Sequence, residues 1–155
     1  MKIRPAREDE LQELSDLCMR SKAWWGYDDA FMEACRDELS VTEQDLRDTP
    51  VAVLELNGQP MGVAQVDPQG ELAELDKLFV DPRAIGTGAG RKLWEWSVGT
   101  ARSLGAKKFK VVADPGAAAF YEHMGAVPAG SVPSGSIPGR ELPCLVLELD
   151  DSAIA

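Results

Sequence analysis

The sequence predicts a single α/β (α+β) domain with a mixed, mostly antiparallel central sheet. Residues 51–80 hold three apolar segments separated by turn residues, a glycine-rich turn follows at 86–90, and a helical pattern then precedes another apolar segment at 108–113. Short turns join antiparallel strands, whereas a helix between two strands favours a parallel crossover. The sheet is therefore expected to change from antiparallel to parallel near the glycine-rich turn.

Composition and charge limit the classes of function. The chain has 155 residues, 45% of them apolar, and no linker divides it, so we expect one domain over residues 1–155. Its 26 acidic and 16 basic side chains give a net charge of −10, which disfavours nucleic acid and anionic membranes as partners and favours an amine substrate. The N-terminus has no apolar leader and no apolar run could span a bilayer, which indicates the cytoplasm.

The three cysteines, Cys18, Cys35 and Cys144, are far apart and lie in apolar surroundings. An odd number of widely spaced cysteines fits neither a disulfide framework nor a metal knuckle. We expect three buried thiols and no metal site.

The first fifty residues predict a short opening strand followed by helices. Apolar residues recur at helical spacing within Glu8–Lys22 and Asp28–Leu39, and Trp24-Trp25-Gly26-Tyr27 separates the two helices. Thr42-Glu43-Gln44-Asp45 has the pattern of a helix start.

An antiparallel meander follows. Val51–Leu56 is predicted as a strand, Asn57-Gly58 as a hairpin turn, and Met61–Val66 as the partner strand. Pro68-Gln69-Gly70 then turns the chain into a strand over Glu71–Val80.

The second half alternates helices and strands. One helix face is marked by Leu93, Trp96 or Ser97, Ala101 and Leu104, and Gly105 is its expected end. The remaining predictions are a strand at Lys108–Ala113, a short helix at Ala117–Met124, a mobile loop at Pro128–Arg140 and a final strand at Leu142–Leu149.

The glycine-rich turn predicts a phosphate-binding site. Gly86, Gly88 and Gly90 join an apolar strand to a helix, and glycines let backbone amides at a helix start approach an anion closely. A Walker A loop is excluded because Arg91-Lys92-Leu93 follows the last glycine instead of Lys-Ser/Thr. The Gly-x-Gly-x-Gly spacing weakens a dinucleotide fingerprint, although Asp114 lies loosely where its acidic residue is expected.

The strand before this turn carries a second feature. Leu75, Leu78 and Val80 break the period-two alternation across Asp76-Lys77, which predicts a β-bulge. An ordinary buried strand with two solvated charges is the alternative.

Together these pieces resemble the GNAT (Gcn5-related) N-acetyltransferases over roughly residues 51–149. The resemblance rests on the Val80-Asp81-Pro82 strand exit, the glycine-rich turn with its helix, and Ala117-x-x-Phe120-Tyr121-x-x-x-Gly125-Ala126. It implies a sheet of about six or seven strands splayed at the centre and flanked by about four helices. It also implies acetyl-coenzyme A as cofactor, and direct attack of a small-molecule or peptide amine on its thioester in a ternary complex.

The resemblance implies a coenzyme site. The family loop can be placed to begin at Arg83 or at Ile85, and the distance from Val80 favours Ile85, which replaces the usual Gln/Arg. The implied coenzyme residues are Leu78, Phe79, Val80, Ile85, Gly86, Thr87, Gly88, Ala89, Gly90, Arg91, Asp114, Ala117 and Phe120.

The resemblance also implies catalytic residues. Tyr121 matches the family tyrosine that protonates the departing thiolate, and Glu74 falls where certain members carry a catalytic glutamate, with Asp76 as the alternative base. His123, two residues beyond Tyr121, is expected on another helix face, as a structural or surface residue rather than the base.

The acceptor amine is expected near the first two helices and the loop before the last strand. Candidate residues there are Trp24, Trp25, Tyr27, Glu33 and Arg140. Arg140 could clamp an acceptor carboxylate or phosphate, or pair with an acidic side chain. A non-catalytic acyl-coenzyme A sensor of the same fold is the rival function, and an exposed last strand could pair two copies into a homodimer.

Overall fold

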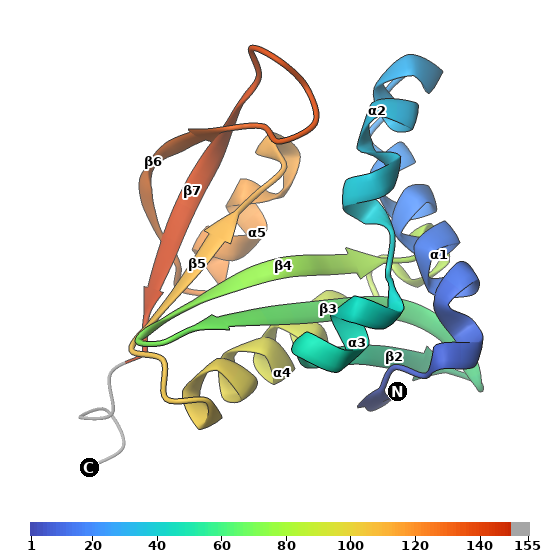
Figure 1. Ribbon diagram of the computed structural model, residues 1–155, viewed down its shortest axis with the longest axis horizontal. Coiled ribbons are helices and arrows are strands. Elements are labelled where there is room, and N and C mark those ends of the chain that lie inside the picture. Colours follow the sequence, from blue (N-terminus) through green and yellow to red (C-terminus); the bar gives the residue numbers. More distant parts are fainter. Residues whose placement is uncertain (150–155) are drawn as a thin grey trace.

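The computed structural model describes residues 1–149, which form a seven-stranded sheet with the order β1-β2-β3-β4-β5-β7-β6 (Figure 1). The strands are β1 (Lys2–Pro5), β2 (Val51–Leu56), β3 (Gln59–Gln69), β4 (Leu72–Val80), β5 (Lys108–Val112), β6 (Val127–Pro133) and β7 (Glu141–Glu148). All neighbouring strands are antiparallel except β4 and β5, which confirms the predicted mixed sheet and its parallel crossover.

Helices cover both faces of the sheet. They are α1 (Leu11–Ala23), α2 (Asp29–Leu39), α3 (Glu43–Asp48), α4 (Ala89–Ser103) and α5 (Ala118–His123). Side chains cap the predicted starts of α2 and α3. Asp28 accepts a hydrogen bond from the Phe31 amide, and Thr42 forms a reciprocal capping box with Asp45. The short helix α3 makes the count five where the resemblance implied about four.

The β2–β3 hairpin turns where the sequence predicts. Asn57 and Gly58 both adopt positive φ, 53° and 79°, as a type I′ turn requires. The next turn differs from the prediction, because Pro68 and Gln69 continue β3 and the chain reverses only at Gly70.

The predicted mobile loop over Pro128–Arg140 is wrong in its first half. Residues Val127–Pro133 form β6, the outer strand of the sheet, with a register irregularity between Pro128 and Ser131. An edge strand tolerates proline because one side of its backbone has no partner. The strand β7 therefore lies inside the sheet, between β5 and β6, so the last strand offers no free edge for a homodimer.

Two core layers lie on opposite faces of the sheet. One packs α4 and α5 on the sheet through residues such as Trp94, Ala101 and Phe109, and the other packs α1 and α2 through residues such as Leu14 and Leu17. Leu104, predicted on the buried face of α4, is 44% exposed because it caps the helix end.

The three cysteines are buried and unpaired, as predicted. Within residues 1–149, none of the helices has the length and apolar character that a membrane span requires.

Candidate active site

The central feature of the site is a gap between two neighbouring parallel strands. β4 and β5 pair only from Leu72 with Lys108 to Leu75 with Val111 and then diverge, as Figure 1 shows. Beyond Leu75, β4 keeps its pairing with β3 through Val80, so its other backbone edge faces the gap. A cleft of about 900 Å³ occupies this gap and reaches from the glycine-rich turn to α2 and the β6–β7 loop.

The predicted bulge lies where the two strands part. Gln65 pairs with Lys77 and Val66 with Leu75, so Asp76 has no partner residue on β3. The extra residue shifts the alternation, since Leu75 and Leu78 both pack toward the α4 side while Phe79 packs toward α1 and α2.

The glycine-rich turn presents backbone amides at one end of the cleft. Gly86 and Gly88 have φ of 84° and 89°, which glycine adopts without strain, and Gly88 is the N-cap of α4. The first amides of a helix have no partner within the helix, so those of Gly90 and Arg91 remain available to an anion. Thr87 instead supports the turn, because its hydroxyl donates to the Ala84 carbonyl oxygen and accepts from the Ala89 amide.

Two arginines brace the strand exit before the turn. Asp81 is buried and accepts hydrogen bonds from Arg83 and Arg20. The bonds from Arg83, followed by those from Arg20, hold the pKa of Asp81 far below its ordinary value. Arg83 is therefore engaged with Asp81, whereas Arg91 lines the cleft.

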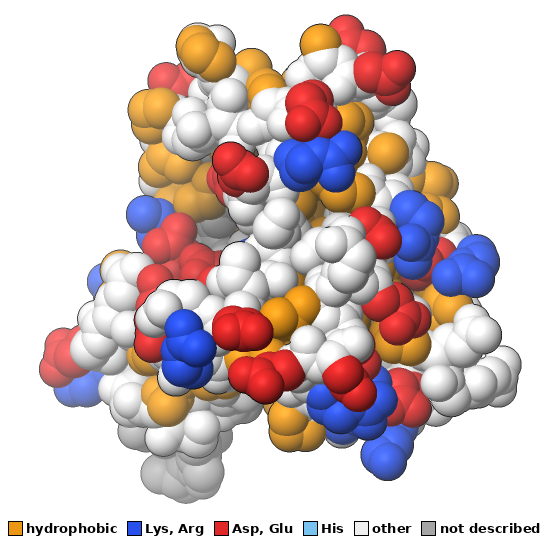
Figure 2. Space-filling view, turned by 45° about the vertical axis from the view of Figure 1, so that its right-hand side comes forward, with side chains coloured by type: hydrophobic (Ala, Val, Ile, Leu, Met, Phe, Trp, Pro, Cys, Tyr) orange, Lys and Arg blue, Asp and Glu red, His pale blue; other side chains and the backbone are white. Residues whose placement is uncertain are grey.

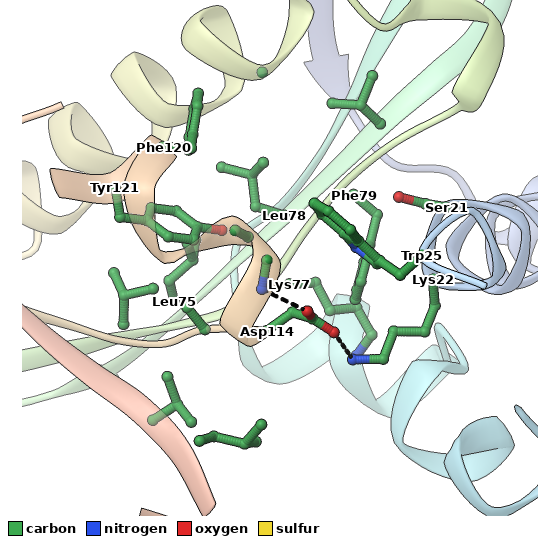
Figure 3. Close-up of a pocket in the computed structure, with 18 of the residues that line it drawn as sticks. Ser21, Lys22, Trp25, Leu75, Lys77, Leu78, Phe79, Asp114, Phe120 and Tyr121 are labelled. Atoms are coloured by element: carbon green, nitrogen blue, oxygen red, sulfur yellow. Dashed lines mark hydrogen bonds and ion pairs between the residues drawn. The ribbon is translucent and has the colours of Figure 1, made fainter. Parts of the chain in front are cut away.

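Tyr121 closes the wall of the cleft opposite β4. Its ring packs against Trp94 and Phe120, with ring centroids 5.5 and 5.1 Å away. Figure 3 shows its hydroxyl directed into the cleft toward Leu78. Burial raises the pKa of Tyr121, which keeps the phenol protonated and able to donate a proton.

Two carboxylates line the cleft beside the bulge. Glu74 lies directly before the point where β4 leaves β5, and Asp76 is the bulged residue itself. Burial, followed by the nearby carboxylates of Asp67 and Glu74, raises the pKa of Asp76 to about 6. A carboxylate with that pKa is ionised at neutral pH and accepts a proton more readily than an ordinary aspartate.

Asp114 joins three elements at the end of β5. One carboxylate oxygen accepts from Lys22 at 2.8 Å (Figure 3). The same oxygen accepts from the Tyr27 hydroxyl at 2.7 Å and lies 3.5 Å from Arg140. The other oxygen accepts from the Gly116 amide. Burial would raise the pKa of Asp114, but these hydrogen bonds hold it below its ordinary value.

The connection between α1 and α2 lies across the end of β5. A β-carbon on Gly116 would lie only 2.6 Å from the Trp25 ring, so this contact requires glycine. The Lys22 and Tyr27 bonds to Asp114 anchor the same connection on either side of Trp25.

The end of the cleft near α2 is bridged by the β6–β7 loop. The Ser136 hydroxyl bonds to Glu38 on α2, and Ile137 packs against the core of α1 and α2. Arg140 donates to the Tyr27 hydroxyl at 2.6 Å. The space-filling view shows a notch between the two upper lobes of the molecule, with acidic side chains spread over this face (Figure 2).

The structure brings most of the predicted site residues to this cleft. Those that line it are Trp24, Trp25, Glu74, Asp76, Leu78, Phe79, Val80, Ile85, Gly86, Gly88, Ala89, Gly90, Arg91, Asp114, Ala117, Phe120, Tyr121 and Arg140.

Three predicted residues lie elsewhere. Thr87 points back into its own turn, and Tyr27 lies behind Asp114 and Arg140. Glu33 lies outside the cleft, because it is 69% exposed and pairs with Arg36. Its position on α2 places it on the solvent face rather than on the face of Cys35 and Leu39.

Several residues that line the cleft have no recognisable signal in the sequence. The most important is Lys22, whose contact with Asp114 joins positions 92 residues apart and has no counterpart in local periodicity. Glu38, Lys77 and Gly116 were also missed. Within the described part of the chain, His, Cys, Asp and Glu side chains form no group of three that could hold a metal ion.

This architecture has counterparts among known proteins. The model of the acetyltransferase (GNAT) family matches residues 10–126. No curated protein matches the chain significantly.

Solved structures share the fold at low sequence identity. A GCN5-related N-acetyltransferase from Rhodopseudomonas palustris has a TM-score of 0.80 at 21% identity, covering 95% of this chain and 94% of its own. The putative acetyltransferase yncA from Salmonella typhimurium, solved with acetyl-CoA, has a TM-score of 0.69 at 22% identity, covering 97% and 94%. The PaiA N-acetyltransferase from Thermoplasma acidophilum, solved with coenzyme A, has a TM-score of 0.76 at 16% identity, covering 95% and 98%.

Proposed function

Because this chain belongs to the acetyltransferase (GNAT) family, whose members use acetyl-coenzyme A, we propose that it transfers the acetyl group to a primary amine by direct attack in a ternary complex. The observation that carries the proposal is one continuous cleft that joins an open glycine-rich turn, a splayed strand edge and the Tyr121 hydroxyl. The coenzyme supplies a thioester whose acetyl carbon is the electrophile.

The residues of the cleft fit that coenzyme. Gly86 and Gly88 shape a turn that side-chained residues would strain, and the helix start beyond them favours a diphosphate. The β4 edge at Leu78–Val80 offers backbone groups to an extended ligand, since β5 has moved away. Asp114 fits the implied coenzyme role less well than the other residues, because its carboxylate is already bonded to Lys22 and Tyr27.

The chemistry assigned to the chain's own residues is proton transfer and charge stabilisation. The attacking nitrogen forms a bond to the acetyl carbon, and the bond from that carbon to sulfur breaks. Asp76 takes the proton that the amine loses, with Glu74 as its neighbour in the same wall. Tyr121 gives its proton to the departing thiolate, and backbone amides near Leu78 or Phe79 meet the developing oxyanion.

The test is thiol release in the presence of an amine panel. The proposal expects coenzyme A thiol and an N-acetylated amine to form together in equal amounts. Tight acetyl-coenzyme A binding without turnover of any amine would instead support the non-catalytic sensor. Nicotinamide or flavin dinucleotide binding without coenzyme A affinity would overturn the coenzyme assignment.

A further inference from the structure

Two cationic side chains share a single carboxylate inside the cleft. Lys22 lies 2.8 Å and Arg140 3.5 Å from the same oxygen of Asp114, and the side chains of all three are 10–18% exposed. Asp114 therefore serves as ion-pair partner to both cations. The Glu38 carboxylate lines the same cleft and bonds to Ser136, but within the described residues no ion pair joins it to Lys22 or Arg140. An anionic group of a ligand would give the second cation a partner of its own.

Arg140 has hydrogen-bond capacity left over. A guanidinium carries five N–H donors, but among the described residues only its Nη2 has bonded partners. Within residues 1–149, no fully buried side-chain nitrogen or oxygen lacks a partner, so the Nε and Nη1 of Arg140 are open to the cleft. The free N–H groups on Nε and Nη1 lie on different edges of the guanidinium, so each can donate one charge-assisted hydrogen bond to an anion such as a carboxylate.

The orientation of Arg140 is set by its surroundings. Its guanidinium lies 4.8 Å from the Phe31 ring centroid and 5.1 Å from that of Tyr27, and the two rings are stacked 3.9 Å apart. The Tyr27 hydroxyl accepts from it at 2.6 Å. A cation fixed in this way has little conformational freedom to lose on binding an anion.

The carboxylates of Glu74 and Asp76 line another part of the same cleft. The cleft thus offers both a cationic and an anionic recognition group to one ligand. The β6–β7 loop bridges to α2 beside Arg140 through Ser136 and Glu38, which encloses the acceptor end. An enclosed end suits a small molecule better than a side chain on a folded protein.

Building on the function proposed above, we propose that the acceptor is a small amine that also carries a carboxylate, as amino acids do. Its carboxylate binds Arg140 and Lys22, and its amine faces Asp76 and Glu74. Lys22 and Arg140 therefore select the acceptor rather than hold the coenzyme.

The experiment compares matched acceptors that differ only in the carboxylate. Initial rates are measured for a series of amino acids, their carboxamides and their decarboxylated amines, with acetyl-coenzyme A saturating. The wild type is expected to show kcat/KM about 10- to 100-fold higher for the carboxylate form, which is the range for a lost charge-assisted hydrogen bond. Arg140→Met and Lys22→Met should remove this preference, and Arg140→Lys should keep part of it.

Controls separate the two proposals. Arg102→Met removes an exposed cation from α4, outside the cleft, and should keep the full preference. The affinity for coenzyme A, measured by calorimetry, should be unchanged in the Arg140 variants. An unchanged affinity would also show that these variants are folded. Equal rates for all three acceptor forms, a preference for amides or diamines, or a preference that survives both Arg140→Met and Lys22→Met would overturn the carboxylate assignment.

If no amine is acetylated although the coenzyme binds, the proposed catalysis fails independently. The carboxylate-binding site is then tested separately, by measuring the affinity of the amino acids for the protein–coenzyme A complex by calorimetry. Binding that Arg140→Met weakens supports the site, and an absence of binding overturns it.

Discussion

Replacing Gly88 with glutamate is the sharpest test of the coenzyme site. Gly88 caps α4 with φ of 89°, a conformation that costs an L-residue about 1–2 kcal/mol. The new carboxylate would also lie where backbone amides are proposed to hold a diphosphate, because the residue begins the helix. A hydrogen bond from an amide to a charged oxygen contributes about 1.5–3 kcal/mol.

Loss of two such bonds gives the expected magnitude. The sum is about 3–6 kcal/mol, which corresponds to a Kd for coenzyme A about 150- to 20,000-fold weaker. Calorimetric titration measures this directly, and a thermal melt confirms that the variant is folded. A folded Gly88→Glu protein with unchanged affinity would refute the assignment of the glycine-rich turn.

Gly99→Glu is the matched control. Gly99 lies exposed in the same helix, its φ is not positive, and an added β-carbon would meet nothing within 4 Å. The substitution introduces the same charge away from the helix start. It should leave the Kd unchanged and raise stability by up to about 1 kcal/mol, because glycine is a poor helix former.

Three further substitutions test other parts of the account. Tyr121→Phe keeps the buried ring but removes the proton donor, so kcat should fall about 10- to 100-fold while the Kd for coenzyme A, measured by calorimetry, is retained. Asp76→Asn should remove the rise of kcat/KM near pH 6, where the wild-type carboxylate ionises. The native state binds this proton more tightly than the unfolded chain, so wild-type stability should fall as pH rises from about 4 to 6. Urea titrations should therefore show the variant more stable at pH 7, by under about 1 kcal/mol because the carboxylate is only partly buried and solvent screens it. Arg4→Met removes the closer ion-pair partner of Glu10, which is 5% exposed and keeps only Arg7 at 3.7 Å, and should cost up to about 3 kcal/mol in urea unfolding at pH 7.

The pH dependence checks the last substitution. The hydrogen bond from Arg4 holds the pKa of Glu10 below its ordinary value of 4.5. The stabilisation is therefore present above that value and lost as pH falls, so the difference between Arg4→Met and wild type should shrink in acid. A difference independent of pH would contradict the ion-pair explanation.

Two other outcomes would contradict the proposed mechanism. Normal turnover in Tyr121→Phe would show that its hydroxyl is not the proton donor. An unchanged pH profile in Asp76→Asn would show that Asp76 is not the base.

Local patterns predicted the parts of the fold that local physics determines. The Asn57-Gly58 turn, the Thr42 cap and the break in alternation across Asp76-Lys77 each depend on neighbouring residues, and each is in the structure. The strand β6 was missed because prolines and glycines normally mark loops, whereas pairing with β7 stabilises this segment as an edge strand.

The end of the cleft at the glycine-rich turn was predictable because it is built from one contiguous segment and its glycines. The end near α2 and the β6–β7 loop was less predictable, because it is assembled from contacts between distant residues. Lys22, Arg140 and Asp114 come together only when three elements fold against one another. Glu33 was misplaced because composition near a helix does not tell which face its side chain occupies.

The most direct test of the central claim is a single assay of wild-type protein with acetyl-coenzyme A and an amine panel that includes amino acids. Thiol release and the N-acetylated product are quantified together. We expect both to appear in equal amounts, and only when an acceptor amine is present. Acetyl-coenzyme A binding with no amine-dependent product would contradict it.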